Sequence, residues 1–166
     1  MKTKVTKLIA ISLSLLALSA CTPGNQTMVD QDPALSWMDG ACSKSTQGVS
    51  LSVSYLGKVT THCALDYSGN GWELFKAAGF EVKGTAKYPT AFACTIDGEP
   101  KSAKCDDSAT SSAYWGYYVF TKGTWGYATT GAADHKSLCG DSEGWVYMET
   151  ENTKVDLPTP VDYACN

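Results

Sequence analysis

The sequence predicts an exported α+β domain in which one short helix lies across a mixed β-sheet and disulfides staple the fold. Segments with strand periodicity precede and follow a single helical segment, an order typical of α+β proteins. The sequence has seven cysteines, all beyond an N-terminal segment typical of secretion, and the six that follow Cys21 indicate an oxidising compartment. The length of 166 residues suits one domain with its own core.

The first twenty residues have the layout of a secretory signal peptide. Lys2, Lys4 and Lys7 precede an uncharged apolar run over residues 8–18. That run is too short to cross a bilayer as a helix, which takes about 20 residues. We therefore expect residues 1–20 to be removed during export.

The residues that follow the apolar run indicate a lipid anchor. Leu18-Ser19-Ala20-Cys21 resembles the lipobox of bacterial lipoproteins, in which the cysteine thiol is acylated and becomes the new N-terminus. The resemblance implies a surface lipoprotein with Cys21 as its lipidation site, held more firmly than by one myristoyl chain. An ordinary signal peptide next to a cysteine is the alternative. We expect residues 21–40, rich in Pro, Gly, Asn and Gln, to form a flexible tether and residues 41–166 to form the domain, with structure beginning between residues 37 and 42.

Charge excludes one class of partner. Without the leader, ten lysines stand against seventeen acidic residues, which gives a net charge near −7, and the chain has no arginine. Such a surface repels nucleic-acid phosphates and lacks the guanidinium groups that commonly read guanine. Nucleic acid is therefore not expected as a partner, and anionic lipid headgroups are disfavoured.

Six cysteines beyond Cys21 predict three disulfides. Proximity in the sequence decides only one pair, which closes a loop around Asp97-Gly98. A zinc site would need short ligand spacings such as Cys-x2-Cys, which the sequence lacks, so no metal site is expected. The expected pairs are Cys94 with Cys105, Cys63 with Cys139, and Cys42 with Cys165.

The clearest strand signal is the alternation of apolar residues with serines over residues 49–55, the period of a half-buried strand. A turn at Leu56-Gly57-Lys58 and renewed alternation over 59–65 predict a hairpin. Residues 129–143 are predicted to form a loop. Further strands are predicted over residues 92–96, 114–120, 125–128 and 145–148.

One helix is predicted after the hairpin. Asn70 can cap it, with Glu73 three residues later, and Gly79 suits its C-terminal end. Trp72 and Phe75 fall on one face. A helix of about two or three turns is not stable alone in water, so we expect this face to pack on the sheet.

Aromatic residues are concentrated in the second half of the chain, beyond what one face of a small sheet can bury. Alternation sends Trp115 and Tyr117 to one side of their strand. Tyr114 and Tyr118 point to the other side, and Gly116 leaves a gap between them. One side should pack under the helix, and the other is a candidate exposed platform unless loops or terminal segments cover it. The candidate ligand-binding residues are Trp115, Tyr117, Tyr118, Trp125, Tyr127 and Trp145.

These motifs also carry a family resemblance. The helical segment 71–80, the segment 94–100, the Tyr-Trp-x-aromatic-aromatic strand at 114–118 and the Gly-Trp at 144–145 resemble the β-grasp domain related to the C-terminal domain of transcobalamin. The resemblance covers residues 49–148. It implies a ubiquitin-like β-grasp fold and a surface module that binds a ligand, in some members a corrinoid such as cobalamin, often beside uptake transporters.

Catalysis finds little support, because it needs a nucleophile beside a base or paired carboxylates. His62 is expected on the solvent side of its strand, opposite Cys63. His135 is expected to be a solvated loop residue, although a neutral imidazole could ligate a metal or a corrinoid cobalt. The acidic pairs at 106–107 and 141–143 lack the spacing of a calcium loop and are expected in solvated turns.

We therefore expect a membrane-anchored, extracytoplasmic lipoprotein that binds a ligand without catalysis or a cofactor. The resemblance favours a corrinoid or another small nutrient, taken up with the help of a transporter. The first alternative is an adhesion or assembly protein whose aromatic face docks another protein. The second is a secreted protease inhibitor with an exposed loop over residues 97–104.

Overall fold

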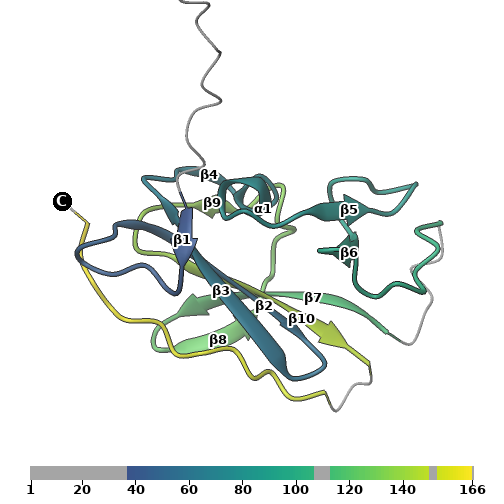
Figure 1. Ribbon diagram of the computed structural model, residues 1–166. Helices are drawn as coiled ribbons and strands as arrows, with labels where there is room; N and C mark the ends of the chain where they lie inside the picture. The colour runs from purple at the N-terminus through teal and green to yellow at the C-terminus, as the bar shows by residue number, and fades with distance from the viewer. Residues whose placement is uncertain (1–36, 107–112, 150–152, 166) are drawn as a thin grey trace, which may run out of the picture. The chain divides into compact units, whose positions relative to one another are not determined.

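The computed structural model describes residues 37–106, 113–149 and 153–165, and the predicted signal peptide, Cys21 and most of the predicted tether lie outside these ranges. Its centre is a mixed six-stranded sheet (Figure 1). A sheet with one short helix agrees with the predicted α+β class. From edge to edge the strands are β1 (Trp37–Asp39), β3 (Lys58–Leu65), β2 (Gly48–Tyr55), β10 (Ser142–Met148), β7 (Tyr114–Thr121) and β8 (Thr124–Tyr127).

The predicted hairpin is confirmed as β2 and β3, which are antiparallel along their whole length. Leu56 and Gly57 form its turn with φ of 50° and 80°, as tight hairpins require. The structure corrects one expectation, because β2 is buried on both faces and not only on one. Its valines and leucine face the core, while Ser54 on the other face donates a hydrogen bond of 2.6 Å to Asp156.

Strand β10 lies between β2 and β7 in the middle of the sheet. It runs parallel to β2, with Trp145 opposite Val53, and antiparallel to β7, with Trp145 opposite Tyr117. The strand begins at Ser142, earlier than predicted, because a buried glutamate at its start breaks the apolar pattern. Every residue of β10 except Tyr147 is buried.

The helix α1 spans Leu74–Ala77 and is shorter than predicted. Asn70 caps the turn before the helix: its Oδ1 accepts hydrogen bonds from the backbone N–H groups of Trp72 (3.0 Å) and Glu73 (2.8 Å). Phe75 is fully buried against β10, so the predicted packing of this segment on the sheet is confirmed. Within the described ranges, no helix has the length and hydropathy that a membrane crossing needs.

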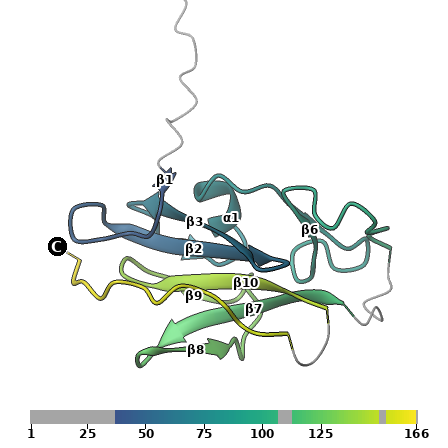
Figure 2. The ribbon, with the colours of Figure 1, turned by 60° about the horizontal axis from the view of Figure 1, so that its bottom comes forward.

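Two short ribbons complete the fold. Strand β5 (Val82–Gly84) pairs with β6 (Ala93–Ile96), so the predicted strand at β6 forms but joins β5 and not the central sheet. Strand β4 (Gly69–Asn70) pairs with β9 (Lys136–Ser137), which lies in the predicted loop. Helix α1 and the β5–β6 ribbon lie on the same side of the central sheet (Figure 2). Strands of two or three residues are too short to show an alternation in the sequence.

The first strand closes one edge of the sheet and lies inside the predicted tether, so the domain begins before residue 41. The Trp37 ring stacks on His62 (4.3 Å between centroids), and His62 stacks on Phe80 (4.5 Å). His62 Nδ1 lies 2.7 Å from the carbonyl oxygen of Ala78. The expectation that His62 faces solvent is therefore wrong: its side chain is 12% exposed, because the ring of Trp37 covers it.

Three disulfides form, as predicted, and they indicate an oxidising, extracytoplasmic environment. They join Cys42 to Cys63, Cys94 to Cys105, and Cys139 to Cys165. The pairing of Cys94 with Cys105 is confirmed. The structure contradicts the other two predicted pairs, Cys63 with Cys139 and Cys42 with Cys165. The reason is that the chain before β2 runs beside β3, and the C-terminus ends beside the loop before β10.

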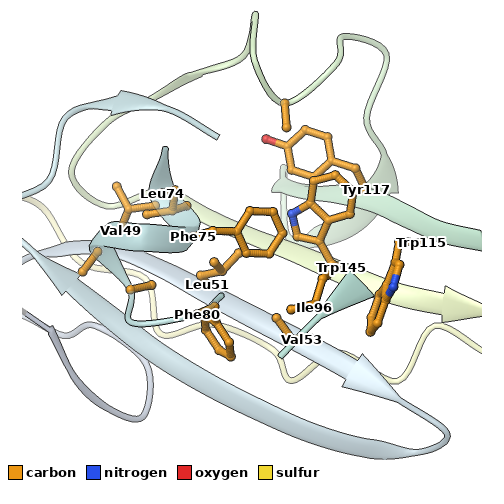
Figure 3. Close-up of a cluster of buried hydrophobic side chains, with 13 residues drawn as sticks. Val49, Leu51, Val53, Leu74, Phe75, Phe80, Ile96, Trp115, Tyr117 and Trp145 are labelled. Carbon is orange, nitrogen blue, oxygen red and sulfur yellow. The ribbon is translucent and has the colours of Figure 1, made fainter. Parts of the chain in front are cut away.

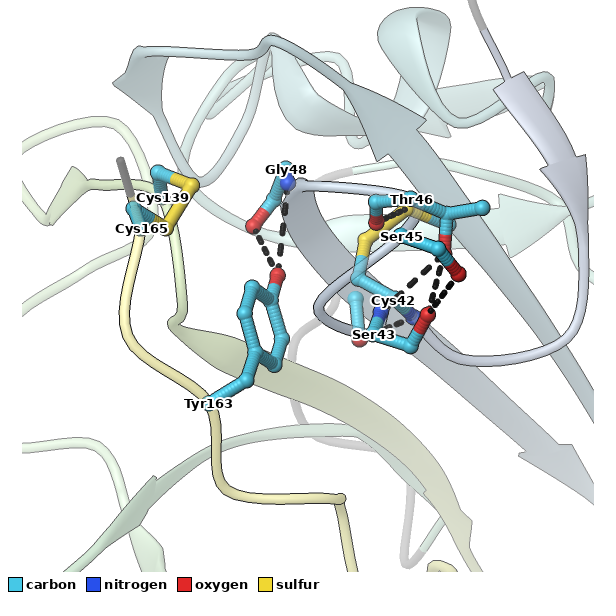
Figure 4. The surroundings of a disulfide bond; sticks show 10 residues. Cys42, Ser43, Ser45, Thr46, Gly48, Cys139, Tyr163 and Cys165 are labelled. Carbon is cyan, nitrogen blue, oxygen red and sulfur yellow. Dashed lines mark hydrogen bonds between the residues drawn. A yellow bond between two sulfur atoms is a disulfide. The ribbon is translucent and has the colours of Figure 1, made fainter.

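The C-terminal strap, residues 153–165, crosses the face of the sheet that α1 does not cover (Figure 2). Tyr163 fastens it by donating a hydrogen bond of 2.8 Å to the carbonyl oxygen of Gly48, next to the Cys139–Cys165 disulfide (Figure 4). Leu157 is 8% exposed and fills the space above Gly144, where a β-carbon would collide with it. The strap therefore supplies part of a second apolar cluster on this face.

Candidate functional site

Three of the predicted ligand-binding aromatics belong to the core beneath α1. Trp115, Tyr117 and Trp145 are 6%, 5% and 2% exposed (Figure 3). The rings of Tyr117 and Trp145 stack at 4.9 Å, and Phe75 of α1 lies 5.1 Å from Trp145. The expectation that these three residues meet a ligand is corrected, because the helix and the ribbons cover the face on which they lie.

The opposite face of β7 and β8 carries a group of tyrosines that remains partly open. Tyr114 is 47% exposed and Tyr127 58%, while Tyr118 between them is buried. The rings of Tyr118 and Tyr127 meet edge to face at 5.3 Å. Gly116 makes room for them, since a β-carbon there would lie 3.1 Å from the Tyr118 ring. We call Tyr114, Tyr118 and Tyr127 the tyrosine patch; strand alternation indicated the outward side of Tyr114, but only the structure shows its exposure.

The rest of this outer face is covered by the C-terminal strap. The indole N–H of Trp125 donates a hydrogen bond of 3.0 Å to the carbonyl oxygen of Pro158, and Trp125 packs on Phe120 at 5.3 Å. The sequence left open whether this face is an exposed aromatic platform or is covered by loops or terminal segments, and each holds for part of the face. The strap covers the aromatics near Leu157 and Trp125, whereas Tyr114 and Tyr127 stay accessible.

The tyrosine patch is aromatic and uncharged. Neither β7 nor β8 contains a charged residue. Burial raises the pKa of Tyr118 and of Tyr127, and the neighbouring phenol of Tyr114 raises both further. The hydroxyl groups of Tyr118 and Tyr127 therefore stay protonated in physiological conditions. Phenol hydroxyl groups can donate and accept hydrogen bonds around an apolar surface.

A second notable group lies in the core, where β10 carries a fully buried carboxylate. Glu143 is 0% exposed, which corrects the expectation of a solvated turn. Tyr117 donates a hydrogen bond of 2.6 Å to its Oε2, and His135 Nε2 lies 3.6 Å from its Oε1. His135 is thus not a free loop residue. The sequence held a signal, since Glu143 alternates with Trp145 and Tyr147 on the inner side of β10.

The segment before α1 packs directly against this carboxylate. A β-carbon on Gly71 would lie 2.5 Å from the Tyr117 hydroxyl and 2.6 Å from Glu143 Oε2, so only glycine fits. The backbone N–H of Gly71 donates to His135 O (3.2 Å) and that of Trp72 to Ala132 O (3.2 Å). The Glu143 side chain, which is 0% exposed, therefore contacts both β7 and the 129–141 segment.

Burial sets the protonation of this group. It raises the pKa of Glu143 above its ordinary value, although the Tyr117 hydrogen bond and the nearby His135 act in the other direction. Burial, with the charges of Glu73 and Glu143, raises the pKa of Tyr67 to about 12. Burial, together with the charge of Glu143 and the hydrogen bond to it, also raises the pKa of Tyr117.

Two hollows in the described surface are open to solvent. One of about 430 Å³ is lined by residues 44–47, Leu65 and Asp66. Another, of about 200 Å³, lies beside the tip of the β2–β3 hairpin and includes Lys154 and Asp156. The first is mostly polar, and the second combines apolar side chains such as Leu56 and Val146 with charged ones, whereas small-molecule sites are lined mostly by hydrophobic side chains. Among the described residues, no three His, Cys, Asp or Glu side chains gather as a metal site would require, and Asp107 lies outside them.

Comparison of the chain with protein-family models, with curated proteins and with solved structures gives no match. The chemistry of the described residues therefore carries the functional argument.

Glu143→Gln should remove a pH-dependent loss of stability that the buried carboxyl group causes in the wild-type protein. A raised pKa means that the folded protein holds the Glu143 proton more tightly, so this contribution to stability is complete below the ordinary value of 4.5 and is lost as pH rises toward the folded-state pKa. Relative to wild type, the neutral amide should gain about 1.4 kcal/mol of unfolding free energy for each pH unit in that window. Urea unfolding between pH 4 and 8 measures this difference.

The matched control is Glu149→Gln, one residue beyond β10, where the side chain is exposed. Its stability relative to wild type should change little with pH. A flat difference for Glu143→Gln as well would contradict a proton held by the buried carboxyl.

Proposed function

We propose that the chain is a lipid-anchored extracytoplasmic lipoprotein. Support comes from the lipobox-like Leu18-Ser19-Ala20-Cys21 and from the three disulfides of the folded domain, which require an oxidising compartment. The acyl chains on Cys21 would hold the domain at the cell surface through residues 22–36.

We further propose that the domain is a β-grasp. Leaving out the edge strand β1, the order β3-β2-β10-β7-β8 places the first hairpin beside a central last strand, which runs parallel to β2. A helical turn follows that hairpin in the sequence and packs on the sheet, as in the ubiquitin-like arrangement. This agreement supports the resemblance to the transcobalamin-related domain at the level of fold.

The proposed activity is non-catalytic binding through the tyrosine patch. The observation that carries it is the exposure of Tyr114 and Tyr127 on a rigid sheet whose outer face is otherwise covered by the strap. Tyrosines offer large contact areas at low cost in side-chain entropy, which is why they are enriched in protein interfaces. A half-open aromatic patch that the strap leaves uncovered is therefore a candidate contact surface.

The shape of the patch favours docking of another surface protein over capture of a corrinoid or other nutrient. Small-molecule sites enclose most of their ligand in an apolar cavity, whereas the tyrosine patch lies on a pleated sheet surface. Tyr114 and Tyr127 border it without walls that would close over a ligand. We therefore place adhesion or assembly before nutrient uptake.

Replacing the acylated cysteine should abolish anchoring. A Cys21→Ala chain should be released to the medium or retained as an uncleaved precursor, because no thiol remains to be acylated. Metabolic labelling with an alkyne fatty acid, followed by membrane fractionation, measures both properties, and Thr22→Ala is the control that should stay acylated. A Cys21→Ala chain that remained acylated and attached would overturn the anchor.

Removing the exposed tyrosines should abolish partner contact. A photoreactive benzoylphenylalanine at position 127 in cells should give a discrete cross-linked product, and Tyr114→Ser should reduce its yield at least about tenfold, as for a contact at the centre of an interface. The same photoreactive residue at Leu56, an equally exposed apolar position, is the control. Identical products from both positions would contradict docking through the patch, and dialysis with cobalamin separately tests nutrient capture.

A further inference from the structure

The β5–β6 ribbon carries a second exposed aromatic group, in the loop between its strands. Tyr88 is 39% exposed and Phe92 50%, and their rings meet edge to face at 5.1 Å. Lys87 Nζ lies 5.3 Å from the centre of the Tyr88 ring. We call residues 85–92 the aromatic loop. It presents two apolar rings and a cation together at one tip of the domain.

The loop is held in this conformation by its own backbone. The N–H of Thr85 donates to Phe92 O (3.1 Å), and the N–H of Ala86 donates to Cys105 O (2.9 Å), next to the Cys94–Cys105 disulfide. Tyr88 N–H donates to Thr85 Oγ1 (3.2 Å). These hydrogen bonds order the backbone that carries the two exposed rings, so less conformational entropy would be lost if the rings met a partner.

The charge around the loop differs from that of the rest of the chain. Between Glu81 and Asp106, including both ends, four lysines balance four acidic residues, whereas the chain without its leader has a net charge near −7. Lys83, Lys87, Lys101 and Lys104 are all exposed. The acidic repulsion that disfavours lipid headgroups elsewhere is therefore weak here. An aromatic pair beside lysines is the composition of side chains at membrane interfaces.

The position of the loop suits a nearby bilayer. If Cys21 carries the lipid, fifteen residues separate it from β1 at Trp37. If these residues form the flexible tether that the sequence predicts, they span about 20 Å on average, so the domain would stay close to the membrane and a weak contact would have a high effective concentration. The Trp37 ring packs over Gly79, on the side of the sheet where Ile96 of the β5–β6 ribbon joins the core.

We propose that Tyr88 and Phe92 insert into the headgroup region of the membrane that anchors the chain, with Lys87 beside the lipid phosphates. This contact rests on the proposed lipid anchor. It would turn the α1 and β5–β6 layer toward the bilayer and leave the tyrosine patch, on the opposite face of the sheet, pointing away from it (Figure 2). The lipoprotein would then present its docking surface in a fixed orientation.

Paramagnetic relaxation in nanodiscs tests this contact directly. The chain from Cys21 onward, isotopically labelled, is coupled through the Cys21 thiol to a maleimide lipid in phosphatidylcholine nanodiscs that contain a gadolinium-chelating lipid. Amide signals of residues 85–92 should be attenuated several-fold more than those of β8. Even attenuation over the whole domain, or attenuation centred on another surface, would overturn the proposal.

Two variants make the result specific. Tyr88→Ser with Phe92→Ser should remove the local attenuation, whereas Leu56→Ser with Leu138→Ser, which removes two other exposed apolar side chains, should preserve it. Amide spectra without nanodiscs show that each variant is folded. Concentration-dependent shifts at residues 85–92 in those same samples would instead identify a self-association surface and overturn membrane contact. Because the lipid is attached chemically, failure here leaves the Cys21 anchor standing, and loss of that anchor in cells leaves this result unaffected.

Discussion

The fold depends on burying one strand, β10, on both of its faces. It enters between β2 and β7 and takes backbone hydrogen bonds from a parallel neighbour on one side and an antiparallel neighbour on the other. Such a strand needs a cover on each face. Helix α1 and the ribbons cover Trp145, and the strap covers Gly144 and Val146 with Leu157. The Cys139–Cys165 disulfide, which holds the end of the strap near the start of β10, follows from the same requirement.

The surroundings of the buried Glu143 show how specifically the segments that cover the inner face of β10 are positioned. A carboxylate in a core is costly unless its oxygens have partners. Tyr117 donates a hydrogen bond to Glu143 Oε2, whereas Oε1 is buried without a hydrogen-bond partner among the described residues and lies 3.6 Å from His135 Nε2. A larger residue at 71 would push the segment before α1 off the sheet. The cluster therefore specifies how the 129–141 segment meets β10.

Local signals in the sequence predicted the parts of the fold that are local. The β2–β3 hairpin, the Asn70 turn and the Cys94–Cys105 pair each depend on residues a few positions apart. Contacts between distant segments were not predictable. Cys42 reaches Cys63 because β1 pairs with β3. The same pairing places the Trp37 ring over His62. Strand alternation separated the aromatic residues of β7 into two sides, but it did not indicate which side the helix covers. The predicted set therefore mixed the buried Trp115 and Trp145 with the exposed Tyr127.

Both exposed aromatic groups follow from this architecture. On one face of the sheet, the C-terminal strap does not reach Tyr114 and Tyr127. On the other face, the loop with Tyr88 and Phe92 lies outside the core that α1 and the ribbons form with the sheet. Because it is buried on both faces, β10 should be the most protected element of the domain. Native-state amide hydrogen exchange measures this most directly. Amides at 145–147 should exchange only through global unfolding, and more slowly than those of the edge strand β8. Exchange at 145–147 as fast as in β8 would contradict the account.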